Sequence, residues 1–166
     1  MDAETFLNTN AVYLCGPLEA VSVREGKSWR HKIGKRLVKR GFVILDPTEK
    51  VDKEVCEIGD EKKTLNKLKK DHDWKGFLDK MLPIVHYDLM CVDRASAVLC
   101  YINSPTVHMI GSTHELIVAK REKKKVYVVI DFDPAELNSW LLAIVRPNNI
   151  YTSFDEAINQ LIKDFS

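Results

Sequence analysis

Short apolar runs recur along the chain, and amphipathic stretches separate them. Because such runs contain no charged residue, we expect both faces of each strand to be covered, as in a parallel sheet flanked by helices. The predicted strands are Ala11 to Cys15, Phe42 to Leu45, Ala97 to Ile102 and Val126 to Ile130, with Ile150 to Thr152 as a short fifth candidate.

Helical spacing fills the segments between these strands. Trp29, Ile33 and Leu37 recur at the interval of a helix face, and Gly41 ends that helix. Ser153 and Glu156 have the spacing of a capping box at the start of the last helix. The predicted helices run from about Lys27 to Arg40, Thr113 to Lys123, Pro134 to Val145 and Ser153 to Asp164. Alternating strands and helices predict an α/β fold, a three-layer doubly wound sandwich around a parallel five-stranded sheet of flavodoxin or Rossmann type.

The segment from Glu49 to Leu82 does not follow this alternation. It is rich in lysine and acidic residues, with Trp74 and Phe77 among its few large apolar side chains. We therefore expect residues 49–82 to be a partly helical insertion, lying as a lid over the sheet edge or over the site. Residues 1–166 otherwise contain no repeat or linker, so a single domain is predicted.

Composition and charge narrow the class of protein. The chain is 45% hydrophobic and 30% charged, with a formal net charge of +1, so no overall field attracts it to nucleic acid or to an anionic membrane. No apolar run approaches the roughly 18 residues of a membrane span, and the N-terminus lacks the pattern of a signal peptide. The four cysteines form no CxxC pair, which is typical of reduced thiols. The sequence thus predicts a cytoplasmic protein.

Candidate chemistry lies in the loops that follow the strands, because parallel sheets bind ligands at the carboxyl ends of their strands. Gly16 and Pro17 follow the first strand, and Asp46 to Thr48 follow the second. A longer loop, Asn103 to Ser112, leads into the helix that carries Glu115. We expect its Gly-Ser-Thr sequence to form a helix N-terminus, which favours an anion.

Two carboxylates stand out. Glu115 is expected in the first turn of its helix, where the helix dipole helps to keep it ionised, and an ionised carboxylate can act as a nucleophile. Ser112 and Glu115 equally match a capping box, in which the glutamate only bonds back to the N-cap residue. Asp88 shares a helical stripe with Ile84 and Cys91, so it faces the protein interior and needs either a structural partner or a function. The local patterns leave both alternatives open for each residue.

Three blocks of sequence carry a resemblance to a known family. VYLCGP (residues 12–17), YDLMCVDRASAVLCYI (87–102) and GSTHE (111–115) occur in the order and spacing of the nucleoside 2-deoxyribosyltransferase superfamily, which includes deoxynucleoside 5′-monophosphate N-glycosidases and related nucleotide hydrolases. The sequence resembles this superfamily over most of its length.

The resemblance implies a role for particular residues. Glu115 is similar to the nucleophile that forms a covalent pentosyl-enzyme intermediate, Asp88 to the aspartate that assists departure of the base, and Tyr13 to the tyrosine that holds the nucleophile. The substrate-binding residues implied in the same way are Gly16, Pro17, Gly111, Ser112, Thr113 and Asn138. Asn138 falls where some members contribute a residue to a neighbouring subunit, which implies a homodimer or higher homo-oligomer.

The implied activity is cleavage of the N-glycosidic bond of a nucleoside or its 5′-monophosphate, with the sugar passing to another base or to water. No cofactor is implied, and the five histidines show no metal-ligand spacing. One departure concerns phosphate binding. The deoxynucleotide hydrolases have a basic residue soon after the glycine of the first strand, and this chain has Glu19 near that place. Arg24, Lys27 and Arg30 are the candidates to bind a phosphate instead. The alternative is a non-catalytic nucleotide-binding or signalling module of the same fold.

Overall fold

The computed structural model describes residues 10–18, 21–49 and 60–166, and these residues form a five-stranded sheet whose strands are all parallel. The strand order is β2-β1-β3-β4-β5, which is the doubly wound order of flavodoxin-like proteins. The predicted fold class is therefore confirmed. In this order the chain reverses its direction of winding between β1 and β3, and ligands typically bind at that point.

The strands lie where the apolar runs predict them. Their bounds are β1 (Ala11–Cys15), β2 (Val43–Leu45), β3 (Ala97–Ile102), β4 (Lys125–Ile130) and β5 (Ile150–Tyr151). β1, β3 and β4 are almost wholly buried, whereas β2 at one edge is partly exposed. Because these central strands are buried on both faces, their sequences are uninterrupted apolar runs.

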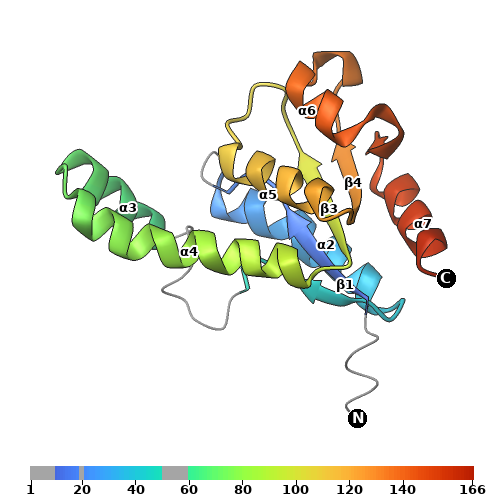
Figure 1. Cartoon of the computed structure of the whole chain (residues 1–166), viewed down its shortest axis with the longest axis horizontal. Coiled ribbons are helices and arrows are strands. Elements are labelled where there is room, and N and C mark those ends of the chain that lie inside the picture. The colour runs from blue at the N-terminus through green and yellow to red at the C-terminus, as the bar shows by residue number, and fades with distance from the viewer. Residues whose placement is uncertain (1–9, 19–20, 50–59) are drawn as a thin grey trace, which may run out of the picture.

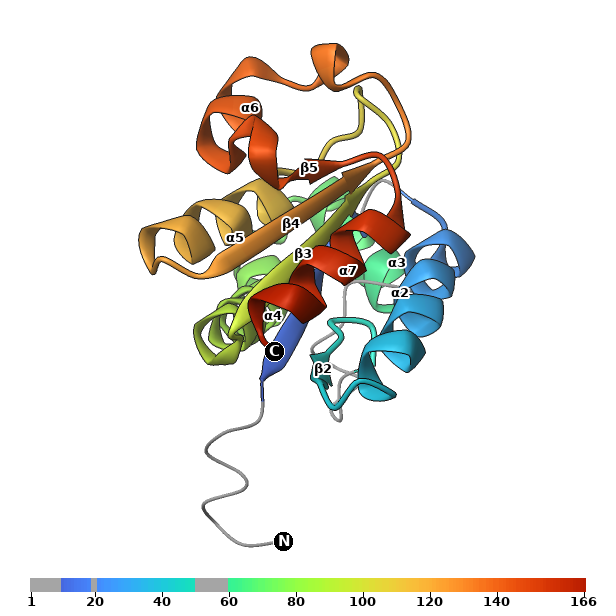
Figure 2. The same ribbon diagram turned by 90° about the vertical axis from the view of Figure 1, so that its right-hand side faces the viewer.

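Helices cover both faces of the sheet (Figures 1 and 2). On one face, side chains of β1, β3 and β4 pack against α4 (Trp74–Arg94), α5 (Ile110–Arg121) and α6 (Ser139–Val145). On the other face, the alternate side chains of the same strands pack against α2 (Val23–Val38) and α7 (Phe154–Asp164). Tyr13 and Cys15 belong to the first of these cores, and Val12 and Leu14 to the second.

Two helices begin earlier than the sequence analysis predicts. α2 starts at Val23 because Ser22 and Glu25 form a complete capping box, in which each side chain binds the main-chain N–H of the other residue. α5 starts at Ile110 instead of Thr113, and its N-cap residue, Met109, makes no side-chain cap hydrogen bond. An apolar N-cap gives no signal in the sequence, so the start of α5 was not predictable from cap residues.

The prediction of a single helix from Pro134 to Val145 is wrong. The segment is divided into a short 3₁₀ turn, η2 (Pro134–Glu136), and helix α6. The side-chain oxygen of Asn138 accepts hydrogen bonds from the N–H groups of Trp140 and Leu141, which starts a new helix at this point. A second 3₁₀ turn, η3 (Pro147–Asn149), follows α6 and leads into β5.

The expected insertion at 49–82 is helical over the part that the structure describes. Residues 50–59 lie outside the described part of the chain; residues 60–70 form α3 (Asp60–Lys70), and α4 begins at Trp74. α3 and the start of α4 extend away from the sheet (Figure 1), and Met81 on α4 reaches the cavity described below. The lid role of this segment stays a prediction. Among the described residues, no helix is both long and apolar enough to cross a membrane.

Candidate active site

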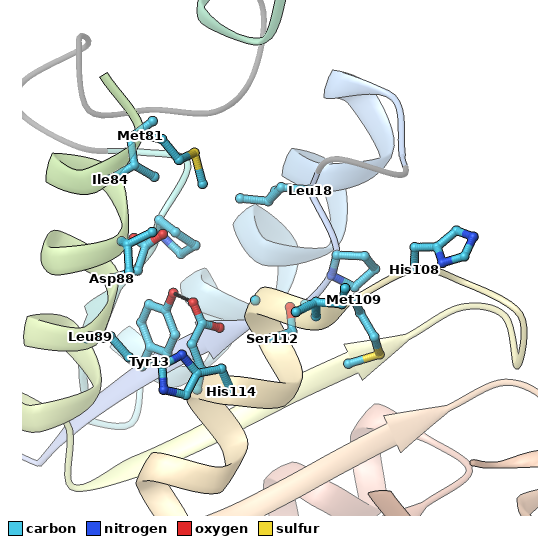
Figure 3. A pocket seen from close by; sticks show the side chains of 17 residues that line it. Tyr13, Leu18, Met81, Ile84, Asp88, Leu89, His108, Met109, Ser112 and His114 are labelled. Atoms are coloured by element: carbon cyan, nitrogen blue, oxygen red, sulfur yellow. Dashed lines mark hydrogen bonds between the residues drawn. The ribbon is translucent and has the colours of Figure 1, made fainter. Parts of the chain in front are cut away.

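A cavity of about 440 Å³ opens at the carboxyl ends of β1 and β3, at the reversal of the strand order. Its walls come from four parts of the chain: β1 with the loop after it, the loop after β2, helix α4, and the loop and first turns of α5. The lining residues include Tyr13, Gly16, Pro17, Leu18, Pro47, Met81, Ile84, Asp88, His108, Met109, Gly111, Ser112, His114 and Glu115. Figure 3 shows Met81, Ile84, Asp88 and Leu89 on α4, facing Leu18 and Ser112 across the space.

Glu115 is held by β1 through both of its carboxylate oxygens. The Tyr13 hydroxyl donates to Oε1 at 3.0 Å, and the Cys15 thiol donates to Oε2 at 3.0 Å. Tyr13 and Cys15 are two residues apart on a strand, so their side chains point to the same face of the sheet. Helix α5 packs on that face and presents Glu115 to both donors. The carboxylate is therefore fixed in position at the cavity wall.

Both donors stay protonated over the ordinary pH range. Burial, followed by the charges of Glu115 and Asp88, raises the pKa of the Tyr13 hydroxyl well above its usual value of 10.0. Burial also raises the pKa of the Cys15 thiol well above 9.0, with Cys100 and Glu115 as further causes. A group with a raised pKa keeps its proton as pH rises, so the two hydrogen bonds to Glu115 persist at neutral and mildly alkaline pH.

Glu115 does not close the helix end in the way the capping-box alternative requires. The helix begins at Ile110, so Ser112 lies inside its first turn and is not the N-cap residue, and Glu115 lies beyond the first turn in which the sequence analysis placed it. The N–H of Thr113 already binds the carbonyl of Met109, which leaves the N–H groups of Ile110, Gly111 and Ser112 as those that helix geometry does not satisfy. Gly111 and Ser112 line the cavity, so this helix end adds a partial positive charge to its wall.

Asp88 is the second carboxylate of the cavity. It lies on α4 with only 7% of its surface exposed, on the same buried stripe as Ile84 and Cys91, as its helical spacing predicts. Its charge contributes to the raised pKa of Tyr13, and Figure 3 shows it above the Tyr13 ring. The Tyr13 hydroxyl is thus near two acidic side chains, Asp88 of α4 and Glu115 of α5.

The loop after β1 brings main chain close to the cavity. A side chain at Gly16 would place its Cβ 2.8 Å from the carbonyl oxygen of Tyr101, so only glycine fits there. Pro17 and Leu18 follow it along the cavity wall, and Pro47 joins them from the loop after β2. Glu19 lies outside the described residues. Arg24 and Lys27 are exposed on α2, and Arg30 is fully buried.

Two predicted site residues lie elsewhere. Thr113 and Asn138 line a neighbouring cavity of about 620 Å³ between α5 and α6, together with the exposed Trp140. His108, Met109, Ile110 and His114 line both cavities, so the two spaces adjoin. Within one chain, these two residues are not part of the group around Glu115.

Sequence reasoning missed Cys15 as a contact of Glu115. Its position in an apolar strand is typical of a buried, chemically silent thiol. The signal that identifies it is the two-residue spacing from Tyr13, which places both side chains on one face of β1. In the part of the chain that the structure describes, no group of three or more His, Cys, Asp or Glu residues is placed to hold a metal ion.

Comparison with known proteins adds to this picture at the level of the fold. No protein-family model matches the sequence. No curated protein matches it either. The structure is similar to that of a 2-desoxiribosyltransferase from Leishmania mexicana, with a TM-score of 0.62 and 12% sequence identity, over 93% of this chain and 97% of that chain. At this identity the likeness shows a shared fold across nearly the whole length of both proteins.

Proposed function

We propose that the protein cleaves the N-glycosidic bond of a nucleoside or nucleoside 5′-monophosphate, with Glu115 as the nucleophile. The observation that carries the proposal is the arrangement of Glu115. Its carboxylate is held by Tyr13 and Cys15 at the wall of a cavity that also contains the buried Asp88. Glycoside-cleaving sites typically combine two carboxyl groups with different environments. The fold shared with a 2-desoxiribosyltransferase agrees with this chemistry.

The proposed reaction has two steps. In the first, an oxygen of ionised Glu115 forms a bond to the sugar C1′, and the bond from C1′ to the base nitrogen breaks. The base leaves with the bonding electron pair and takes a proton from Asp88, so the proposal requires that Asp88 is protonated in the substrate complex. In the second, a nitrogen of another base or the oxygen of water forms a bond to C1′ and loses its proton to Asp88, and Glu115 leaves as a carboxylate with the electron pair of its bond to C1′.

The walls of the cavity fit the two halves of such a substrate. Met81, Ile84 and Leu18 supply an apolar surface, and an aromatic base gains free energy from burial against it. The helix end at Gly111 and Ser112 supplies N–H groups for the 5′ oxygen of the sugar or its phosphate. A purely nucleotide-binding module would use the same walls and leave the bond intact.

A chromatographic assay tests the proposal. The wild-type protein is incubated with a panel of nucleosides and 5′-monophosphates, with and without a second free base, and released or exchanged base is measured. Release of base supports the proposal, and exchange with the added base identifies a transferase instead of a hydrolase. Binding of these compounds without any release contradicts the proposal and supports the binding module.

The hydroxyl of Tyr13 provides a first prediction. Tyr13→Phe removes one of the two donors to Glu115 and leaves the ring in place, so kcat should fall about 10-fold or more as the nucleophile loses its orientation. Tyr127→Phe is the matched control, because its hydroxyl is also bound to a carboxylate, that of Asp164, on the other face of the sheet. Equal kcat values for the two variants would contradict the positioning role of Tyr13.

The proposal includes a homo-oligomer, in which the region of Asn138 approaches a neighbouring subunit. The exposed side chains of Ile110 (86%) and Trp140 (79%) support it, because both line the second cavity and apolar side chains gathered at one exposed place often mark an interaction site. Light scattering should therefore give at least twice the mass of 19.0 kDa for one chain. Trp140→Ser should shift the mass toward that of one chain, and a wild-type protein of one-chain mass would contradict this part of the proposal.

A further inference from the structure

The guanidinium of Arg30 is fully buried next to Gly16, a residue of the cavity wall, and is bound to the main chain. Nε donates to the carbonyl of Leu14 at 3.1 Å, Nη2 to that of Gly16 at 2.9 Å, and Nη1 to that of Gly26 at 2.5 Å. A buried charge is costly unless hydrogen bonds compensate it. These donors satisfy the end of β1, the turn after it and the first turn of α2 at once, so Arg30 is not placed to bind a phosphate.

One of these bonds reaches the cavity wall directly. Gly16 lines the cavity, and its carbonyl accepts from Arg30. The next residue is Pro17, which has no N–H, so this turn cannot be held by a hydrogen bond from that position. Arg30 Nη2 would lie 3.3 Å from a Cβ at Gly16, which shows how closely the guanidinium supports the turn from behind.

The same guanidinium reaches the loop after β2. Nε lies 3.9 Å from Oδ1 of Asp46, whose side chain is nearly buried. This contact is an ion pair, and the hydrogen bonds that the Oδ1 atom accepts come from the N–H and the hydroxyl of Thr48, at 2.8 and 2.7 Å. Pro47, between these two residues, lines the cavity. Arg30 therefore contacts two separate loops of the cavity wall, the one at Gly16 through a hydrogen bond and the one at Asp46 through an ion pair.

We propose that Arg30 is a positioning residue for the reaction at Glu115, which sets the distance between the Gly16–Leu18 and Pro47 walls and the nucleophile. This inference rests on the proposed function. Only arginine has donors in a rigid planar fork that can bind several acceptors in fixed directions; lysine keeps the charge but not this geometry. The face of the Trp29 ring, 4.6 Å from the guanidinium carbon, further restricts its orientation.

Kinetics of Arg30→Lys and Arg30→Ala test the proposal in the full chain. With the substrate that the wild type cleaves, kcat/KM of Arg30→Lys should fall about 10- to 100-fold, since small displacements in a site cost rates of this order. Added guanidinium ion, well below denaturing concentrations, should restore part of the activity of Arg30→Ala and none of that of Glu115→Gln. Arg36→Lys, on the same helix and bound to Asp155 at the surface, is the control and should match the wild type.

The outcomes show whether the proposed function fails or only the role of Arg30. No base release by the wild type removes the proposed function and the inference with it. An active wild type with an equally active, folded Arg30→Lys, or with an Arg30→Ala variant that guanidinium does not restore, overturns the inference alone. Circular dichroism and thermal melting report the fold of each variant. Failure of both Arg30 variants to fold also overturns it, because stability then accounts for the residue.

Discussion

Replacing Glu115 by glutamine is expected to lower the rate of base release by about 1,000-fold or more, because loss of a nucleophile removes the covalent route altogether. The substitution preserves the size of the side chain, and its amide oxygen can still accept from the Tyr13 hydroxyl. The amide NH₂ group then faces the Cys15 thiol and cannot accept the hydrogen bond that the carboxylate oxygen accepts in the wild type. Release of base, followed by chromatography under single-turnover conditions, measures the effect.

Glu122→Gln is the matched control for this substitution. It makes the same chemical change at the other end of α5, where the Glu122 carboxylate pairs with Lys124. The control should keep the activity of the wild type. A Glu115→Gln variant that retains a tenth or more of the wild-type rate would contradict the nucleophilic role, provided that the wild type is active.

Replacing Asp88 by asparagine should have the second-largest effect, a loss of about 100- to 10,000-fold, which is typical of removing a general acid and base. Asparagine keeps the shape of the buried side chain but cannot give a proton to the leaving base or accept one from the incoming group. Asp79→Asn, on an exposed position of the same helix, is the control and should leave the rate unchanged.

The leaving group distinguishes proton transfer from a structural role of Asp88. A substrate whose leaving group departs without a proton, such as a 4-nitrophenyl 2-deoxyriboside, should lose much less rate in the first step of the Asp88→Asn variant than a nucleoside does. Equal losses for both substrates would mean that Asp88 serves only to hold the sugar or the fold.

The central part of the fold could be predicted from the sequence because burial leaves a clear pattern. Ala11–Cys15 and Ala97–Ile102 are covered on both faces, so every position must be apolar or small, and their ends were predicted to the residue. Asp88 was placed on the buried face of its helix for the same reason, since Ile84, Cys91 and Val92 define that face. Strong burial thus gives both the element and its orientation.

Cap interactions and contacts between distant segments were harder to predict. Ser22 and Glu25 form a capping box that is visible in the sequence, but Met109, the N-cap residue of α5, makes no side-chain cap hydrogen bond and gives no such signal. The division before α6 depends on the amide of Asn138, in a segment that otherwise has helical spacing.

The site itself depends on contacts across the chain. The hydrogen bond between Cys15 and Glu115 joins residues 100 positions apart, and Arg30 links helix α2 to one loop by a hydrogen bond and to another by an ion pair. Spacing along the sequence predicts which face a side chain occupies, whereas its partner depends on the assembled sheet.

A covalent intermediate on Glu115 is the central claim of this account, and mass spectrometry of an acid-quenched reaction tests it most directly. The wild-type protein is mixed with a substrate that it cleaves, quenched and digested. The digest should contain a peptide that carries one additional pentosyl group on Glu115. The group should be absent from Asp88→Asn quenched at the same time with a nucleoside, because that variant forms the intermediate slowly. Base release by the wild type without any adduct, or with an adduct on a different residue, would contradict the account.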